Sequence, residues 1–418
     1  MGNCIDFKHD INCGTRKKRI LPQRIDSVSS WDSPKVELVD FKKKGIIGEG
    51  INSKVFLVEK LDSGHHYAMK VMTCTRKLKW DSNDMRKERV ILEKLRHPFI
   101  VTLKYAFQKG PKLHLVVELA NGGDLYRHLQ NSGKLPEDHW RFYAAEILSG
   151  LNYLHNNKVI YRGLKPEDVL LDKYGHVKLS DFELAKSCDK ISTTFWGEPY
   201  YMAPEVIKGE SQSYEVDWWS FGVLIYEMLV GEPPFRGKDL KDTLKTICDH
   251  NIMLPNDMSK HAQSLITNLL CPNPELRLGH GEKGVKDIQE HPFFKNLNWE
   301  EVENRGLPAP YIPNIGSDSE VWYIEANDIT QSRHEKLHQT MRGRHSEANE
   351  SNFYFNVSPS FNWLSVIMPS KTFLIVRPTQ RWRTDKHLET CWITNNFNIW
   401  VSLNRPLLIF TVYDNSHH

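Results

Sequence analysis

Two glycines, a lysine and a glutamate in the first quarter of the chain have the types and order expected of a phosphate-binding site. Gly48 and Gly50 lie in a turn between apolar segments, where glycines let backbone amides approach phosphate oxygens closely. Lys70 follows in the apolar run Tyr67–Met72, and a lysine there is costly to bury unless it meets an anion. Glu88, in the next helical segment, is the expected partner of Lys70.

The glycine turn alone is a weak signal, because many hairpins carry two glycines and Ser53 stands where a third could be. A dinucleotide-binding turn would be followed by a helix and by an acidic residue about 20 positions later. Here a strand follows instead, and the residue at that distance is Lys70. The turn, the lysine and the glutamate together therefore favour a phosphate site of another kind.

A second group of motifs rich in charged residues lies between positions 161 and 277. They are Tyr161-Arg162-Gly163-Leu164-Lys165-Pro166-Glu167-Asp168, Ser180-Asp181-Phe182-Glu183, Met202-Ala203-Pro204-Glu205, Asp217-Trp218-Trp219 and Arg277. Glu205 and Asp217 stand in apolar sequence, so ordinary surface charge is a poor explanation for them.

The elements that would position these residues change in type along the chain. Apolar runs and alternation predict strands near Ile46, over Val55–Val58 and Tyr67–Met72, and in the segments Val101–Tyr105 and Leu113–Val117. Helical spacing follows over Met85–Leu95, after Pro136 and over Asp217–Val230, which is apolar nearly all round and stops at Gly231. A strand-rich half before a larger helical half predicts an α+β, two-lobed plan.

Composition excludes several classes of protein. With 40% hydrophobic and 26% charged residues, the 418-residue chain is neither wholly disordered nor fibrous. A net charge of +3 implies no domain-wide basic surface, so no nucleic acid is expected as a partner. The seven cysteines include no CxxC pair, which disfavours a zinc ribbon or a disulfide framework and fits a reducing compartment. No run reaches the ~20 apolar residues of a membrane span.

The N-terminus carries signals for peripheral membrane attachment. Gly2 is a candidate for myristoylation and Cys4 for palmitoylation, although Asp6 stands where the acylation motif has Ser or Thr. The basic block Arg16–Arg19 would supply a second, electrostatic signal. A solvated basic tail and a nuclear-import patch are the alternatives, so the expected location is cytoplasmic, with membrane association or nuclear entry left open.

From about Phe41 to Phe294 the chain resembles a eukaryotic protein kinase of the AGC serine/threonine group. The run Glu88–Gln108, the close at His291-Pro292-Phe293-Phe294 and the segment Ser346–Asn349 are most similar to the ribosomal-protein S-six kinases. The polar, Ser-rich sequence before Phe41 indicates a flexible segment at 1–40. The resemblance implies a kinase domain at 41–294 with an N-lobe at 41–120 and a C-lobe at 121–294, and an AGC-type tail at 295–370. Residues 371–418 show no readable period and stay unassigned.

The resemblance also implies roles for individual residues. Lys70, held by Glu88, would bind the α- and β-phosphates of ATP, and Lys165 would neutralise charge on the transferred phosphoryl group. Asp168 and Asp181 would face Mg²⁺. Glu205 is expected to pair with Arg277, and Asp217 to brace the Arg162 loop. The remaining positions implied in ATP binding are Ile47, Gly48, Glu49, Gly50, Val55, Ala68, Glu118, Ala120 and Asp124.

The departures from the family pattern concentrate at the reacting positions. Gly163 stands where the family has its catalytic Asp, so that position has no carboxylate to orient and deprotonate a substrate hydroxyl. Asp168 replaces a metal-binding Asn, Glu183 replaces the glycine of Asp-Phe-Gly, and Glu198 replaces a Thr of the substrate pocket. A positioned general base contributes about 10²–10⁴-fold, so Gly163 alone would leave a slow kinase. The combination predicts inefficient turnover.

The sequence therefore predicts a kinase-like protein that binds ATP and Mg²⁺ but transfers phosphate poorly, acting as a signalling scaffold (a pseudokinase). The alternative is an active Ser/Thr kinase for protein substrates with basic residues near the target. Thr194 matches the activation-loop phosphosite, with Arg162 present to receive a phosphate. The tail motif reads Asn352-Phe353-Tyr354-Phe355-Asn356-Val357, without a phosphorylatable residue at the family position, so switching by phosphorylation there is not expected.

Overall fold

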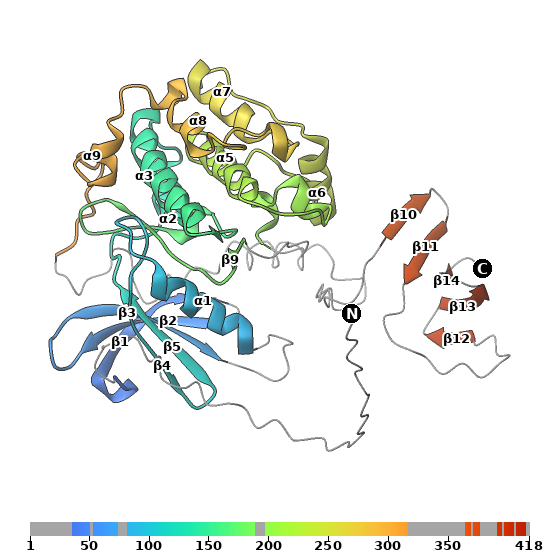
Figure 1. Cartoon of the computed structure of the whole chain (residues 1–418), viewed down its shortest axis with the longest axis horizontal. Helices are drawn as coiled ribbons and strands as arrows, with labels where there is room; N and C mark the ends of the chain where they lie inside the picture. The colour runs from blue at the N-terminus through green and yellow to red at the C-terminus, as the bar shows by residue number, and fades with distance from the viewer. Residues whose placement is uncertain are drawn as a thin grey trace, which may run out of the picture. The chain divides into compact units, whose positions relative to one another are not determined.

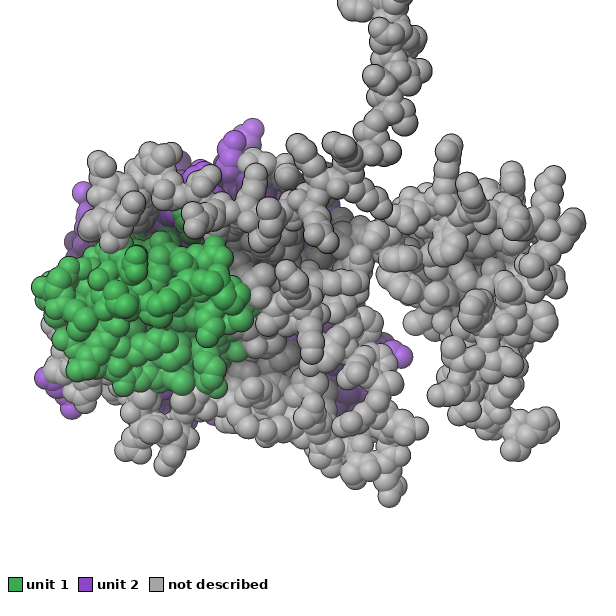
Figure 2. All heavy atoms as spheres, turned by 90° about the horizontal axis from the view of Figure 1, so that it is seen from below, with its two compact units in different colours: residues 1–89, 102–119 green, residues 90–101, 120–418 purple. Residues whose placement is uncertain are grey.

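The computed structural model describes residues 36–50, 53–73, 82–188 and 197–316, and the backbone of five strands between 364 and 414. The chain divides into two compact units, shown in Figures 1 and 2. Unit 1 comprises residues 1–89 and 102–119, and unit 2 comprises residues 90–101 and 120–418. The N-terminal acylation signals and Thr194 lie outside the described residues.

Unit 1 is built on a five-stranded antiparallel sheet with the strand order β1-β2-β3-β5-β4. The bounds of its strands are β1 Phe41–Glu49, β2 Ser53–Lys60, β3 His66–Thr73, β4 Leu103–Lys109 and β5 Lys112–Glu118. Every predicted strand of this half is present, although β4 begins at Leu103 and not at Val101. The helix α1, Ser82–Lys94, follows β3, and the division between the units falls inside it, after Arg89.

A hydrophobic cluster of unit 1 lies on one face of this sheet. It is formed by side chains from four strands, which are Phe41, Val58, Met69, Val71 and Val116. Val36 and Leu38 pack against this cluster, and a short 3-10 helix at Leu38–Asp40 leads into β1. Residues 36–40, which the sequence assigns to the flexible N-terminal segment, are therefore part of the fold.

Unit 2 is mainly helical. Its helices are α2 Leu125–Ser132, α3 Glu137–Asn156, α4 Pro204–Ile207, α5 Glu215–Val230, α6 Leu240–Asp249, α7 Lys260–Leu269, α8 Val285–Gln289 and α9 Trp299–Glu303. Two small antiparallel sheets lie before α4 and carry the loops of interest; their strands are β6 Val159–Ile160 with β9 Lys186–Ser187, and β7 Val169–Leu171 with β8 Val177–Leu179.

Helix α5 is the central element of unit 2. Its residues from Val216 to Met228 are all buried, as its nearly continuous apolar sequence predicts for a core helix. It ends at Gly231, whose φ of 96° is in the left-handed region that glycine adopts without strain. Helix α5 contacts α3 and α7 and, at its first turns, the segment that contains Tyr201. The loops described below are anchored to it.

Strands also occur in the C-terminal part of the chain, where the first lies within the 295–370 segment that the sequence assigns to the tail and the other four lie within the unassigned residues 371–418. They form a five-stranded antiparallel sheet in the order β10-β11-β14-β13-β12. Their bounds are β10 Leu364–Met368, β11 Lys371–Val376, β12 Cys391–Thr394, β13 Phe397–Asn404 and β14 Leu407–Asp414. No helix among the described residues is both long and apolar enough to cross a membrane.

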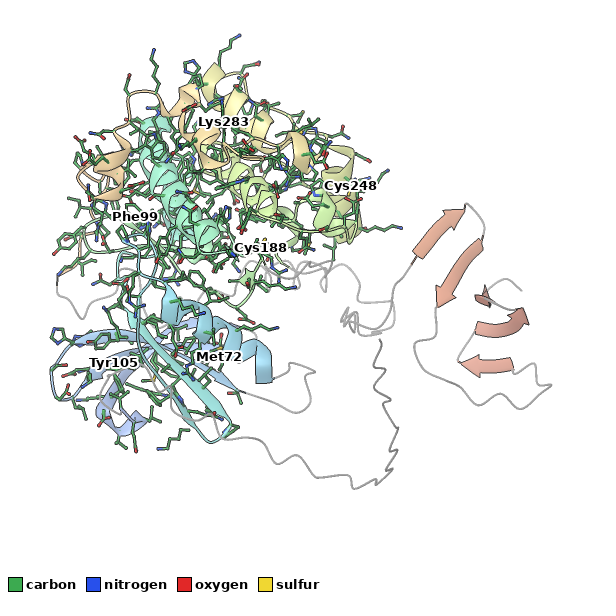
Figure 3. All side chains as sticks on the ribbon, viewed as in Figure 1. Met72, Phe99, Tyr105, Cys188, Cys248 and Lys283 are labelled. Atoms are coloured by element: carbon green, nitrogen blue, oxygen red, sulfur yellow. The ribbon has the colours of Figure 1, made fainter. Side chains whose placement is uncertain are left out.

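The cysteines of the described region are reduced. Cys188, Cys248 and Cys271 are free thiols, and Cys188 and Cys248 lie well apart in Figure 3.

Candidate active site

Lys70 and Glu88 form an ion pair inside unit 1. Lys70 lies on β3 and Glu88 on α1, and Lys70 Nζ donates to Glu88 Oε1 at 2.9 Å and to Oε2 at 3.1 Å. The side chains are only 12% and 3% exposed. Because neither charge is fully hydrated there, each stabilises the ionised form of the other. The contact predicted from the sequence is present, and it fixes an ammonium group at the middle of β3.

The glycine turn joins β1 to β2 in the same unit. Gly48 lies opposite Val55, and Val55 lies opposite Lys70. The glycine turn and the lysine therefore lie at the same level of the sheet, on β1 and β3, with β2 between them. A Cβ on Gly48 would meet only Val55, at an ordinary contact distance of 3.6 Å. The fold therefore has room for a side chain at Gly48 and does not itself require glycine. A ligand that must approach the backbone closely would explain the glycine at this position.

Further residues that the resemblance assigns to ATP binding lie on the strands around Lys70. Glu49 ends β1 and pairs with Lys54 at 2.6 Å on the surface. Ala68 is buried on β3, and Glu118 ends β5, where its carboxylate accepts a hydrogen bond from the Thr102 amide at 2.9 Å. Ile47 lies next to Gly48 in β1.

Asp124 belongs to unit 2 and has a structural task there. It is the N-cap of α2, and its Oδ1 accepts a hydrogen bond from the Arg127 amide at 2.9 Å. Burial raises the pKa of Asp124 above its ordinary value, although the Arg127 amide and guanidinium act in the opposite direction. Ala120 stands at the first residue of this part of unit 2. The ribose contact that the resemblance implies for Asp124 stays a prediction.

The loop that carries Gly163 is fixed from below by Asp217 of α5. Asp217 Oδ2 accepts hydrogen bonds from the Tyr161 amide at 2.9 Å and from His155 at 2.8 Å, and Oδ1 accepts one from the Arg162 amide at 2.7 Å. Asp217 is fully buried. These contacts hold Arg162 at a φ of 60°, which is uncommon for a residue other than glycine. The predicted bracing role of Asp217 is confirmed by these contacts.

Gly163 occupies a position that has room for a side chain. A Cβ there would lie 3.8 Å from the nearest backbone oxygens and 3.9 Å from Asp168 Oδ2. Its φ is not among the positive values, so the backbone does not require glycine either. The absence of a carboxylate at this position is therefore a change in chemistry that the surrounding structure does not impose.

Lys165 lies among carboxylates two residues further along this loop. Its Nζ is 3.7 Å from Asp168 Oδ2. Asp168 contributes most to raising the pKa of Lys165 above its ordinary value, and burial opposes this effect. The other carboxylates that raise it come from three segments and are those of Glu167, Asp181 and Glu198. Lys165 is therefore a firmly protonated cation at neutral pH.

Asp181 and Glu183 follow β8. Asp181 is exposed and has a φ of 50°, while Phe182 is fully buried against Tyr161 with ring centroids 5.2 Å apart. The Glu183 amide donates to Asp181 Oδ1 at 3.2 Å. Glu183 itself has no positive φ. The loop thus accommodates glutamate in place of glycine without backbone strain.

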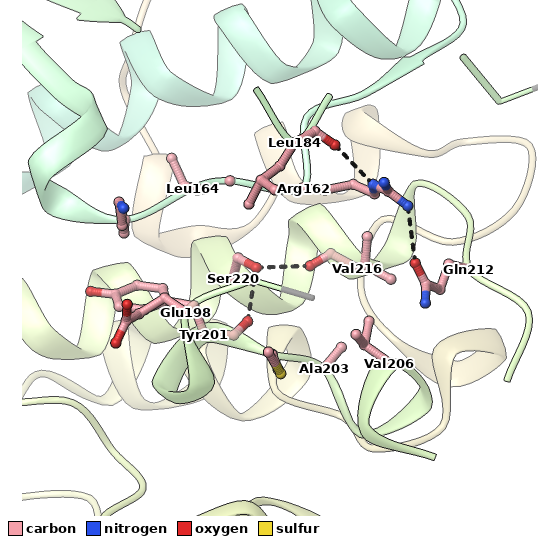
Figure 4. A pocket seen from close by; sticks show the side chains of 14 residues that line it. Arg162, Leu164, Leu184, Glu198, Tyr201, Ala203, Val206, Gln212, Val216 and Ser220 are labelled. Carbon is pink, nitrogen blue, oxygen red and sulfur yellow. Dashed lines mark hydrogen bonds between the residues drawn. The ribbon is translucent and has the colours of Figure 1, made fainter. Parts of the chain in front are cut away.

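A cavity of about 40 Å³ lies below the Gly163 loop in unit 2, and Figure 4 shows it from close by. Arg162 crosses one side of it and donates to the Leu184 carbonyl at 3.0 Å and to Gln212 Oε1 at 3.3 Å. Burial lowers the pKa of the Arg162 guanidinium to about 9, partly offset by Asp217, which still leaves it charged at neutral pH. Gly163, Lys165 and Glu198 also line the cavity.

The pair of Glu205 and Arg277 forms a second buried anchor of unit 2. Arg277 Nη1 and Nη2 donate to the two carboxylate oxygens of Glu205 at 2.6 and 2.9 Å, and each residue is 2% exposed. This two-bond geometry is the strongest form of an arginine–carboxylate contact. The pairing predicted from the sequence is present.

Each unit, taken by itself, carries groups that suit one part of a metal-bound nucleotide. Unit 1 offers a glycine turn and a lysine held by a carboxylate, and unit 2 offers Asp168 and Asp181. No cluster of three or more candidate metal ligands occurs among the described residues. Two carboxylates suffice for Mg²⁺ when phosphate oxygens and water complete its coordination. The donor set therefore suits a metal that arrives with a phosphate ligand.

The sequence did not point to the polar contacts that hold the cavity walls. Gln212 accepts from Arg162 across fifty positions, and the Tyr201 hydroxyl donates to Glu227 inside α5. The signal for the second contact is a glutamate in the mainly apolar helix α5, and Gln212 carries no signal at all.

Comparison with known proteins identifies the family of the chain. Residues 41–294 match the family described as protein kinase domain. The chain is 41% identical over 300 residues to ribosomal protein S6 kinase 2 alpha of Gallus gallus and to ribosomal protein S6 kinase alpha-1 of Homo sapiens, which covers 70% of this chain and 40% and 41% of theirs. It is also 41% identical over 301 residues to the RAC family serine/threonine-protein kinase homolog of Dictyostelium discoideum, which covers 66% of that protein.

The chain therefore spans well under half the length of the two ribosomal S6 kinases that it matches. The match nevertheless includes the whole segment from the glycine turn to the Phe293-Phe294 close, with the sheet of unit 1 and the helices of unit 2 in the order described above. The chain belongs to the protein kinase family, in its AGC serine/threonine group.

Proposed function

We propose that this protein binds ATP with Mg²⁺ and transfers the γ-phosphate slowly, so that it acts in signalling mainly through its nucleotide-bound state. The observation that carries this proposal is a contrast. The Lys70–Glu88 pair is in place at 2.9 Å, whereas Gly163 offers no carboxylate at a position with room for one. In this account Lys70 binds phosphate oxygens, and Asp168 and Asp181 hold the metal.

Phosphate transfer proceeds through a loose transition state, in which positioning and charge stabilisation matter more than removal of the hydroxyl proton. Lys165, kept protonated by its neighbouring carboxylates, is suited to stabilise charge on the transferred group. Loss of the carboxylate at Gly163 is therefore expected to slow transfer without abolishing it. The cofactor supplies the transferable phosphoryl group, and this chain supplies the cations and carboxylates around it.

Calorimetry with ATP, in chelator and in Mg²⁺, tests the nucleotide part of the proposal. We expect binding in Mg²⁺ and its loss in Lys70→Ala, because the variant removes the cation while leaving β3 paired on both sides. Exposed Lys54→Ala, on the neighbouring strand, is the matched control and should bind as the natural chain does. Absence of binding in every metal condition would remove nucleotide from the account and leave a nucleotide-free scaffold.

Two further proposals concern modification of residues outside the described part of the chain. Acylation at Gly2 and Cys4, helped by Arg16–Arg19, would attach the protein to membranes, because one acyl chain alone binds only marginally. Fractionation of cells that express the natural chain or Gly2→Ala tests this, and equal membrane fractions would contradict it. Phosphorylation of Thr194 is proposed as the regulatory event that the family position implies.

A further inference from the structure

The backbone that carries Glu198 is anchored to helix α5. Gly197 precedes it with a φ of 115°, a conformation that favours glycine, and the Tyr201 amide donates to the Glu198 carbonyl at 3.0 Å. Ser220 Oγ of α5 donates to the Tyr201 carbonyl at 3.0 Å, and the Tyr201 hydroxyl donates to Glu227 of the same helix. Glu198 is therefore held at a defined place in unit 2.

The Gly163 loop is anchored to the same helix. Asp217, near the start of α5, accepts the amides of Tyr161 and Arg162 at 2.9 and 2.7 Å. One buried helix thus fixes both the position that lacks a carboxylate and the segment that carries Glu198. Because core helices are closely packed and rigid, α5 fixes the positions of Gly163 and Glu198 relative to each other.

The side chain of Glu198 has no structural task among the described residues. It precedes a 3-10 helix at Pro199–Tyr201 but makes no capping hydrogen bond there. Its Oε1 is excluded from solvent and accepts no hydrogen bond from the described part of the chain. A buried acceptor left unsatisfied is unfavourable, so an unpaired one indicates a group that is kept for another purpose.

The cavity brings this acceptor to the reacting positions. Gly163, Lys165 and Glu198 all line it, and Figure 4 shows Glu198 on a different side from the Arg162–Gln212 contact. Glu198 lies close enough to Lys165 to act on its charge. A cavity volume of about 40 Å³ is enough to hold a water molecule, so a hydroxyl group fits there.

We propose that Glu198 supplies the catalytic carboxylate that Gly163 lacks. In this step Glu198 Oε1 accepts the proton of a substrate serine or threonine hydroxyl while the hydroxyl oxygen forms its bond to the γ-phosphorus of ATP. The bond from that phosphorus to the bridging oxygen breaks, and ADP leaves with the electron pair. Glu198 then releases the proton to water. The carboxylate has moved from the loop of Gly163 to the facing segment.

This inference rests on the proposed function, since it names the residue that supports the slow transfer. A merely structural role for Glu198 predicts a different pattern of variants. Loss of a merely structural carboxylate would lower the transfer rate equally with or without a carboxylate at position 163. A relocated catalytic carboxylate affects the transfer rate only while position 163 has no carboxylate of its own. The two explanations can therefore be separated by combining the two substitutions.

The experiment is a double-substitution cycle in the full-length protein, with single-turnover transfer from ATP to a serine peptide of basic context. Glu198→Gln should lower the rate about 100-fold or more in the natural chain, which is the lower range for a lost general base. In the Gly163→Asp chain the same Glu198→Gln change should cost less than about threefold, because the restored aspartate performs the task. Exposed Glu282→Gln is the matched control for loss of a carboxylate.

Nucleotide affinity is measured on the same samples by calorimetry. Unchanged ATP affinity in Glu198→Gln is expected, so a fall in rate reflects the transfer step. An equal loss in both backgrounds, no loss in the natural chain, or no detectable transfer by the natural chain would overturn the inference. In each of these cases, ATP binding that persists leaves the nucleotide-binding part of the proposed function standing, whereas absent ATP binding contradicts that part separately.

Discussion

The buried anchor residues of unit 2 follow the family pattern, whereas the loop residues that they hold in place depart from it. Asp217 and the Glu205–Arg277 pair make the full set of buried contacts expected of a kinase framework. On the loops that they fix, position 163 is a glycine without a carboxylate and position 198 is a glutamate. We expect the framework contacts to be needed for stability and the loop residues not to be, so that chemistry can change while the fold is preserved.

Unit 1 contains a largely buried ion pair of the same kind as the anchors of unit 2. Lys70 and Glu88 are paired in a largely buried place, and an unpaired charge there would be unfavourable. The pair alone therefore does not prove nucleotide binding, since stability would also retain it. The following experiments separate residues kept for stability from residues kept for chemistry, beginning with the largest expected effect.

The largest effect is expected from breaking the buried pair of the framework. Arg277→Ala would leave Glu205 charged and buried, and such changes cost about 3–5 kcal/mol of unfolding free energy. The matched control is Arg236→Ala, whose partner Glu232 is exposed, with both side chains 56% exposed. That change should cost less than about 1 kcal/mol. Urea unfolding of the full chain measures both, and similar values would contradict the framework interpretation.

The next effect concerns nucleotide. ATP with Mg²⁺ at a hundredfold excess over its dissociation constant should raise the unfolding free energy by about 2.7 kcal/mol. Thermal-shift measurements should show the stabilisation in the natural chain and its loss in Lys70→Ala. A stabilisation that survives Lys70→Ala would show that Lys70 is kept for folding and not for phosphate.

A smaller effect is expected from restoring the catalytic position. Gly163→Asp fits sterically, because the nearest atoms to a Cβ there are 3.8–3.9 Å away. One of them is Asp168 Oδ2, so the new carboxylate would face a like charge. We expect the pair Gly163→Asp and Asp168→Asn to transfer phosphate about tenfold faster than Gly163→Asp alone, a difference of about 1.4 kcal/mol in the barrier. Equal rates would mean that the charge at Asp168 is harmless.

The complete reversal is an extension of that experiment. Gly163→Asp, Asp168→Asn, Glu183→Gly and Glu198→Thr together should give the highest transfer rate of the series. Glu183→Gly is expected to contribute least, since Glu183 already lies in the loop without backbone strain. A series in which Glu183→Gly is the dominant change would contradict this order.

The last effect concerns the acid stability of unit 2. Burial lowers the pKa of His97 to about 4, with a contribution from Lys178, and the ring stacks on Tyr153 with centroids 4.8 Å apart. The unfolded chain binds this proton near pH 6.5, before the folded chain does. Stability is therefore complete above about pH 6.5 and falls towards pH 4, with a slope of at most about 1.4 kcal/mol per pH unit.

His97→Gln should flatten this part of the stability curve, as measured by urea unfolding at pH 7, 6 and 5. The exposed His65→Gln is the control and should leave the slope unchanged. A slope that His97→Gln does not alter would assign the acid sensitivity of this region to other groups.

Regular elements and buried charges were predictable from the sequence, and contacts between loops were not. Helix α5 is recognisable because its apolar residues leave no polar face, and Asp217 and Glu205 because charges in apolar sequence need partners. The Arg162–Gln212 contact joins segments far apart in the chain, and the unpaired oxygen of Glu198 depends on how other segments bury it, so neither leaves a periodic trace in the sequence. The packing of Val36 and Leu38 was missed because the polar residues around them resemble a linker.

The central claim is that this chain keeps the nucleotide site of a kinase while its catalytic carboxylate is missing from its family position. The most direct test measures ATP binding by calorimetry and phosphate transfer in a single turnover on one sample of the natural chain with Mg²⁺. We predict ATP binding that Lys70→Ala abolishes, and transfer at least about 100-fold below the 1–100 s⁻¹ of ordinary kinases. Transfer within that ordinary range, or the absence of ATP binding, would contradict the account.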